Sequence, residues 1–227
     1  MSIFNSLNNI LPFLGAVLGM GIGYKIRDKS SNGLKLILSF SGAFLLGVII
    51  FHLMPEVFSK VNNKSGLWIV SGIILQILLE YLSQGTEHGH SHIKSNEYLP
   101  WVLFLSLCLH AFIEGLPLGH ESSLVWGIFI HKIPIGMVLF YMIWDTKSSK
   151  ILKITALFIF AIMSPFGSIA LEYNDALQNY QTQITAIVIG MLLHIATTIL
   201  FESNQGHAFN IRKLLSILLA FLISYYI

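Results

Sequence analysis

Long runs of apolar residues are the feature of this sequence that most restricts its fold. Eight stretches approach or exceed the length of about 20 residues that an α-helix needs to cross a bilayer. They span residues 7–26, 34–57, 66–83, 98–118, 123–144, 151–172, 182–202 and 211–227. Only 11% of the residues are charged and the mean hydropathy is +0.74, whereas soluble domains carry about 25% charged residues. The sequence therefore predicts an all-α, polytopic membrane protein with eight transmembrane helices in a single bundle.

The connections between these stretches are short and leave no room for a soluble domain. The longest is a polar, histidine-containing loop at about residues 84–97, and we expect one transmembrane domain over residues 1–227. The first residues lack the basic region and cleavage site of a signal peptide. A net charge of +2 gives no support for a nucleic-acid partner. The single cysteine, Cys108, is interpreted as a small apolar core residue.

The distribution of Lys and Arg predicts the orientation of the chain. The connections after the first, third, fifth and seventh stretches hold most of the 13 basic residues, whereas the opposite side holds Lys60 and Lys64. Short loops rich in Lys and Arg remain in the cytoplasm. We therefore expect an integral plasma (inner) membrane protein with its odd-numbered connections in the cytoplasm and both termini outside.

Ionisable residues in the stretches 98–118 and 123–144 are the strongest functional signal. His110 and Glu114 are four residues apart and would share one face of a helix, while His131 lies deep in the next stretch. Two antiparallel helices would bring all three side chains to a common depth. Inserting an ionisable residue into hydrocarbon costs roughly 2.5–3.5 kcal/mol of free energy. A cluster of such residues therefore indicates a functional site. Two imidazoles and a carboxylate suit a divalent cation such as zinc, with a fourth position left for water.

Lys132 directly follows His131 and alters the charge of this cluster. Its ammonium would repel a second divalent cation and could take that cation's place beside an ionised Glu114. We therefore expect one metal ion in the core and not two. A plainer alternative is a buried salt bridge between Lys132 and Glu114 with the histidines hydrogen-bonded around it. That alternative leaves unexplained why two histidines reach matching depths.

Two other groups of potential ligands lie in the apolar stretches. His52 and Glu56 are four residues apart near the predicted outer end of 34–57. They are candidates for an outer site that collects cations, or are simply interfacial polar groups. His194 in 182–202 is a candidate on the route of the ion, or a histidine hydrogen-bonded to a neighbouring helix.

The loop at about 84–97 contains three alternating histidines, His88, His90 and His92. Such a tract in a polar segment can capture a borderline metal weakly and reversibly. The alternative is a solvated loop without a role. We expect the tract to influence the rate or regulation of the protein's activity and not metal binding in the core.

Four short motifs resemble those of the ZIP (Zrt/Irt-like) metal transporters. Residues 52–56, HLMPE, are similar to the family's HLLPE-type helix-two ending, and residues 110–115 are similar to its helix-four motif H-N-x-P-E-G. Residues 131–134, HKIP, resemble the helix-five motif H-E-x-P, and residues 164–167, SPFG, resemble the helix-six motif E-P-x-G. The resemblance extends over nearly the whole chain. It implies eight helices and alternating access that carries metal from outside into the cytoplasm without ATP.

This sequence departs from the family pattern where a second metal ion would bind. At the positions where the family has ligands of the second metal ion, this sequence has residues that cannot replace them: Ala111, Lys132, Ile135 and Ser164. His110, Glu114 and His131 are retained, so the resemblance agrees with a mononuclear site of the type that carries His-Lys on helix five. Ile135 also removes an acid that many members share with the first metal.

The leading hypothesis is a transporter of a divalent metal ion, with zinc favoured and iron or manganese as alternatives. A ligand set of two nitrogens and one oxygen disfavours copper(I) and does not separate zinc from iron. The expected partners are the metal ion and the lipid bilayer, with a homodimer left open, and no catalytic cofactor is expected.

Two alternatives are an intramembrane zinc-dependent hydrolase and a non-transporting metal sensor. A hydrolase would be expected to keep a further carboxylate near the metal as general base. The sequence shows no output domain for a sensor. We therefore expect that the chain is not an enzyme.

Overall fold

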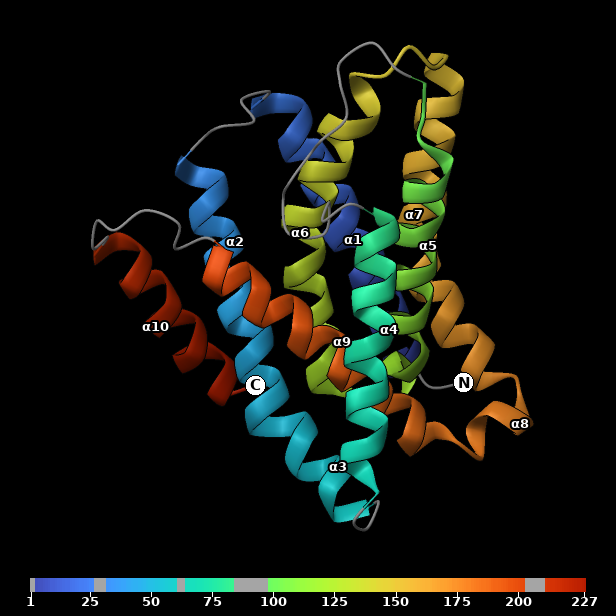
Figure 1. Cartoon of the computed structure of the whole chain (residues 1–227), viewed down its shortest axis with the longest axis vertical. Helices are drawn as coiled ribbons and strands as arrows, with labels where there is room; N and C mark the ends of the chain where they lie inside the picture. Colours follow the sequence, from blue (N-terminus) through green and yellow to red (C-terminus); the bar gives the residue numbers. More distant parts are fainter. Residues whose placement is uncertain (1–2, 27–31, 61–63, 84–97, 203–210) are drawn as a thin grey trace.

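A computed structural model describes residues 3–26, 32–60, 64–83, 98–202 and 211–227 of the chain. These residues form the following helices, shown in Figure 1: α1 (Ile3–Ile26), α2 (Asn32–Val48), η1 (Ile49–Leu53), α3 (Met54–Lys60), α4 (Ser65–Ser83), α5 (Trp101–Gly115), η3 (Leu116–Gly119), α6 (Ser122–Trp144), α7 (Lys150–Glu172), α8 (Asp175–Gln178), α9 (Gln181–Glu202) and α10 (Ile211–Tyr225). The described residues contain no strand, which confirms the all-α prediction.

Seven helical segments in the described residues are long and apolar enough to cross a membrane. The π-helical turn η1 joins α2 and α3 into one segment, Gly33–Lys60, and η3 extends α5 to Gly119. The eighth predicted stretch corresponds to α10, whose 15 residues are fewer than an upright crossing needs. The chain is therefore a multi-pass membrane protein whose helices lie where the apolar stretches predict them.

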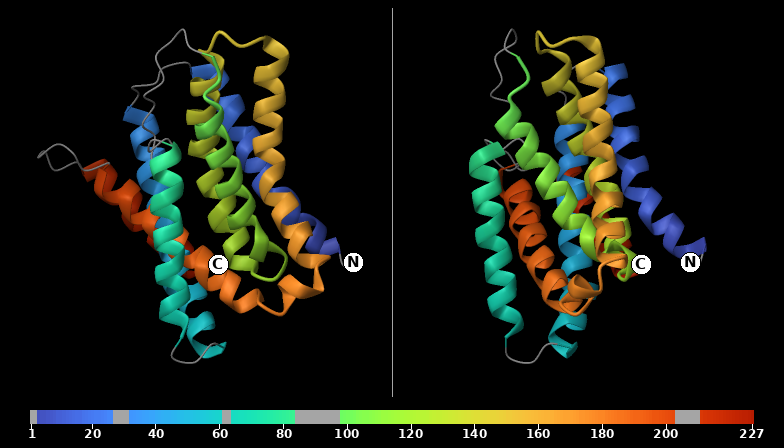
Figure 2. Two further views of the ribbon diagram at one scale, coloured as in Figure 1. Left: turned by 45° about the vertical axis from the view of Figure 1, so that its right-hand side comes forward. Right: turned by 90° about the vertical axis from the view of Figure 1, so that its right-hand side faces the viewer.

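The helices pack in two groups around α6. In the first group α1 packs against α6 and α5 against α7, and in the second α2 packs against α10 and α4 against α9. The helix α6 is buried along most of its length and also contacts α2, so it lies where the groups meet. Figure 2 shows the same arrangement from two further directions.

Glycines in α1 allow this helix to approach α6 closely. A Cβ atom at Gly15 or Gly19 would clash with the backbone carbonyl oxygens of Phe129 and Ile133. Small residues at helix interfaces are a common means of close packing in membranes, where helix association gains little from the hydrophobic effect. The close packing of α1 fixes α6, which carries two of the residues described below.

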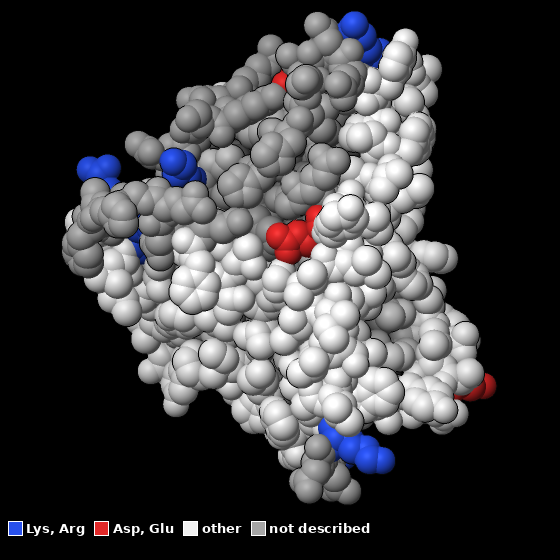
Figure 3. Space-filling view, viewed as in Figure 1, with Lys and Arg blue, Asp and Glu red and all other residues white. Residues whose placement is uncertain are grey.

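The marked N- and C-terminal ends both lie towards the end of the bundle that contains α3 and α8 (Figure 1). The short connection between α6 and α7 lies at the opposite end. In the space-filling view, basic side chains lie at the margins of the visible face (Figure 3). An acidic patch lies near the middle of the visible face, beside described residues that are uncharged.

Candidate metal centre

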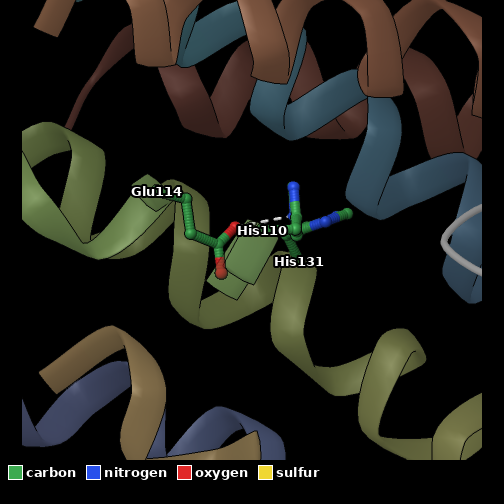
Figure 4. Close-up of side chains that lie close together, drawn as sticks. All are labelled: His110, Glu114 and His131. Carbon is green, nitrogen blue, oxygen red and sulfur yellow. Dashed lines mark ion pairs between the residues drawn. The ribbon is translucent and has the colours of Figure 1, made fainter. Parts of the chain in front are cut away.

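His110, Glu114 and His131 come together in the interior of the bundle. The helix α5 carries His110 and Glu114 one turn apart, and α6 contributes His131 (Figure 4). Each residue offers one potential ligand atom, and these atoms lie within 4.8 Å of one another. The three side chains are between 0% and 3% exposed. In the part of the chain that the structure describes, no other group of three or more such side chains lies this close together.

The imidazole of His110 is held from both sides. Its Nε2 lies 3.3 Å from Glu114 Oε2. Its Nδ1 lies 3.0 Å from the side-chain oxygen Oε1 of Gln76, a fully buried residue of α4. The ring therefore points one nitrogen towards the cluster and the other towards α4.

The carboxylate of Glu114 has partners on two neighbouring helices. Lys132 of α6 forms an ion pair with its Oε1, and the Ser164 hydroxyl of α7 donates a hydrogen bond to the same oxygen over 3.2 Å. The Lys132 ammonium also lies 4.4 Å from the centre of the Phe160 ring, within cation–π range. The salt bridge of the plainer alternative is thus present, and both histidines lie beside it.

Close contact between α5 and α7 places Ser164 beside Glu114. A Cβ atom at Gly115 would clash with the backbone of Ser164, and one at Gly167 would clash with the Phe112 carbonyl oxygen. Because both positions are glycine, the two backbones touch at the depth of the cluster. Pro134 interrupts the backbone hydrogen-bonding pattern of α6, because its nitrogen carries no hydrogen to donate.

The structure gives His52 and Glu56 separate partners. His52 Nε2 lies 2.8 Å from the carbonyl oxygen of Ser224 at the end of α10. Glu56 forms an ion pair with Lys60 and a hydrogen bond with Glu121, which precedes α6. His52 lies in η1, where the π-helical turn is wider than an α-helical one. The hydrogen bonds of the two side chains thus lead to different parts of the structure, α10 for His52 and the connection before α6 for Glu56.

His194 lies on α9 and contacts α4. Its Nε2 is 2.6 Å from Glu80 Oε2, and the two side chains are 21% and 26% exposed. A hydrogen bond to a neighbouring helix was one of the two interpretations of His194 from the sequence, and the structure contains that hydrogen bond. His88, His90 and His92 lie outside the described residues.

The sequence did not predict that polar residues of α4 contact the histidines of α5 and α9. Gln76 and Glu80 are four residues apart on α4, and each contacts a histidine of another helix. The available signal was two polar residues on one face of an otherwise apolar stretch. Such residues inside a membrane span usually face the interior of the bundle.

Comparisons with known proteins agree on one family. A family model described as ZIP Zinc transporter matches residues 80–227. Protein zntD of Dictyostelium discoideum is 34% identical over 105 residues, which are 38% of this chain and 15% of zntD. Zinc transporter ZIP13 of Bos taurus is 30% identical over 103 residues, or 38% of this chain and 24% of that protein.

A third relative, the zinc transporter ZIP13 homolog of Drosophila melanogaster, is 35% identical over 114 residues. The match covers 46% of this chain and 31% of the fly protein. The chain thus spans less than a third of the length of each of these three relatives. The cattle and fly relatives are named as zinc transporters, in agreement with the expectation of a transporter and not an enzyme.

Proposed function

This chain belongs to the ZIP zinc transporter family, whose model matches residues 80–227, and on that premise we propose that it carries a divalent metal ion, zinc first, through one intramembrane site. His110, Glu114 and His131 would be the ligands. The observation that carries the proposal is that their potential ligand atoms lie within 4.8 Å of one another in the bundle interior.

Small movements of the three side chains would suffice to bind zinc. Zinc bonds to nitrogen and oxygen of about 2.0–2.2 Å in tetrahedral geometry separate neighbouring ligand atoms by about 3.4 Å. The cluster is somewhat wider than this, so rotation of the imidazoles would close it. Three protein ligands leave a fourth position for water, which suits an ion that must also leave.

Lys132 supports a site for one ion. Its ammonium already occupies one side of the Glu114 carboxylate, and Ser164 supplies a neutral hydroxyl there. A second divalent cation at this position would meet a buried positive charge without a further carboxylate. We therefore propose a mononuclear site, in which Lys132 takes the charge role of a second metal.

Alternating access would arise from movement between the two groups of helices. The ligands lie on α5 and α6, which pack with α1 and α7, while α2, α4, α9 and α10 form the other group. Movement of the ligand-carrying group would expose the ion first to one side and then to the other. From the distribution of basic residues, we propose that both termini lie outside a plasma (inner) membrane. The inward direction of transport is proposed from the resemblance to the family.

Several residues are proposed to act along the route and not as central ligands. His52 and Glu56 would contribute to the outer side, His194 to the inner side, and the histidines of the loop at 84–97 to capture in the cytoplasm. The whole chain, residues 1–227, would serve as one transmembrane domain. Iron and manganese remain alternative substrates for the same ligand set.

Uptake of radiolabelled zinc into proteoliposomes tests the proposal. The wild-type chain should accumulate zinc, whereas His110→Ala and Glu114→Ala should each reduce uptake to the level of empty vesicles. Cys108→Ala is the matched control, because it removes only a thiol from the same helix and should retain uptake. Wild-type rates in both cluster variants, with intact insertion, would refute the site assignment.

A further inference from the structure

Gln76 brings a buried amide against His110 from the opposite group of helices. Most side chains of α4 face outward, yet Gln76 is 0% exposed and its Oε1 lies 3.0 Å from His110 Nδ1. A buried amide is costly unless it is hydrogen-bonded. An apolar residue would fill this position in a membrane helix at lower cost, so the contact calls for a role beyond packing.

The two nitrogens of His110 face different surroundings. When Nδ1 carries the proton, it can donate to Gln76 Oε1, and Nε2 then presents its lone pair to the cluster. Nε2 is the nitrogen that lies 3.3 Å from Glu114 Oε2. In metal sites, a ligating histidine commonly donates its other N–H to a carbonyl or carboxylate, which fixes its tautomer and raises its basicity.

We propose that Gln76 is a positioning residue that fixes the ring orientation and metal-binding tautomer of His110. This inference rests on the proposed function, since it assumes that His110 binds the transported ion. It assigns Gln76 a role through His110 and not contact with the ion itself.

The position of Gln76 adds a mechanical consequence. Gln76 lies on α4, which packs with α9, whereas His110 lies on α5 in the ligand-carrying group. A shift between the groups would lengthen this hydrogen bond and release the imidazole. The affinity of the site for the metal ion would thus depend on the relative position of the two groups of helices. The ion would be bound less tightly once the hydrogen bond between Gln76 and His110 is broken.

Equilibrium zinc binding to the full chain in detergent tests this inference, with a competing chelator to set the free zinc concentration. Gln76→Leu removes the acceptor at similar size and should weaken zinc binding about 10- to 100-fold. Gln76→Glu keeps an acceptor for Nδ1–H and should retain binding. It should also slow uptake, because a carboxylate would hold the imidazole more firmly when the groups move. Gln76→Met repeats the loss of the acceptor with a different apolar shape.

Ser106→Ala is the matched control. The Ser106 hydroxyl donates to the Leu79 carbonyl oxygen over 2.8 Å, so it joins the same two helices in a buried position without touching an imidazole. Its removal should leave zinc affinity unchanged. The d–d absorption of bound Co²⁺ should change in Gln76→Leu and not in Ser106→Ala, since it reports the ligand field and not the packing.

The outcomes separate this inference from the proposed function. If His110→Ala abolishes binding while Gln76→Leu and Gln76→Met bind like the wild type, the role of Gln76 is overturned and the site stands. Equal losses in Gln76→Leu and Ser106→Ala, or a loss in Gln76→Glu, would also overturn it by indicating a packing effect. If His110→Ala binds zinc normally, the site assignment fails and the inference fails with it.

Discussion

Glu114 is the residue on which the cluster depends most. It is fully buried and contacts Lys132, Ser164 and His110 on three helices. A buried ion pair contributes little net stability when both partners are present, but removal of one partner leaves an uncompensated charge. The pair therefore makes Lys132 a sensitive position for both folding and binding.

Lys132→Ala should destabilise the protein by about 3–5 kcal/mol without zinc, because Glu114 loses its counter-charge. Zinc should then raise the melting temperature more in the variant than in the wild type, since the ion supplies the missing positive charge. Thermal unfolding with and without zinc measures both effects. Lys150→Ala at the exposed start of α7 is the control. An unchanged melting temperature in zinc-free Lys132→Ala would contradict the assigned role of Lys132.

The proximity of His110, Glu114 and His131 could be predicted from the sequence because each is an ionisable group in an apolar stretch. The spacing of His110 and Glu114 places them on one helix face, and an antiparallel neighbour brings in His131. The partner Gln76 could not be assigned in this way. It is 34 positions from His110 in the sequence, and an amide carries no charge that demands a partner.

At the scale of elements, the π-helical turn η1 is a feature that the sequence did not predict. His52 and Glu56 have the separation that pairs side chains on an α-helix, but Ile49–Leu53 forms a π-helical turn. Nothing in the local residue pattern signals that turn. The contact between α10 and η1, through His52 and the Ser224 carbonyl, likewise joins positions 172 apart.

The approach of α1 to α6 should depend on Gly19. Gly19→Ala would place a Cβ against the Ile133 backbone, so we expect destabilisation of about 1–3 kcal/mol from overpacking. Gly21→Ala on the same helix meets no atom within 4 Å and should be neutral. Comparison of the two melting temperatures provides the measurement. Equal behaviour of the two variants would contradict the tight α1–α6 contact.

The connection before α6 contains an acid that should make stability depend on pH. Burial, together with the hydrogen bond that the protonated carboxyl donates to Glu56, raises the pKa of Glu121 from 4.5 to about 8. Glu121 is 6% exposed. The folded state therefore binds this proton more tightly than the unfolded state, and stability should fall as the pH rises from about 4.5 to about 8.

Melting temperatures measured between pH 5 and pH 9 test this expectation. Glu121→Gln keeps the shape of the side chain but cannot ionise, so its stability should fall less over this range. The difference between the two curves isolates Glu121 from groups that titrate in both proteins. Parallel curves would show that Glu121 is ionised in the folded state over this whole range, and so that its pKa is not raised.

At the scale of the whole molecule, hydropathy predicted the segments and their order, but not their grouping. The sequence does not reveal that α5 and α6 pack with α1 and α7 while α4 packs with α9. That division places the three proposed ligands on one group and Gln76 on the other. Transport by movement between the groups is therefore a proposal that depends on packing and not on motifs.

The most direct test of the central claim is the number and ligation of tightly bound zinc ions. Purified full-length chain would be equilibrated with zinc against a chelator strong enough to strip weak sites, then examined by elemental analysis and zinc X-ray absorption. We predict one zinc per chain, with imidazole scattering and nitrogen or oxygen ligands at about 2.0–2.2 Å, and no bound zinc in His110→Ala/His131→Ala. Two zinc ions per chain, or one retained in the double variant, would contradict the account.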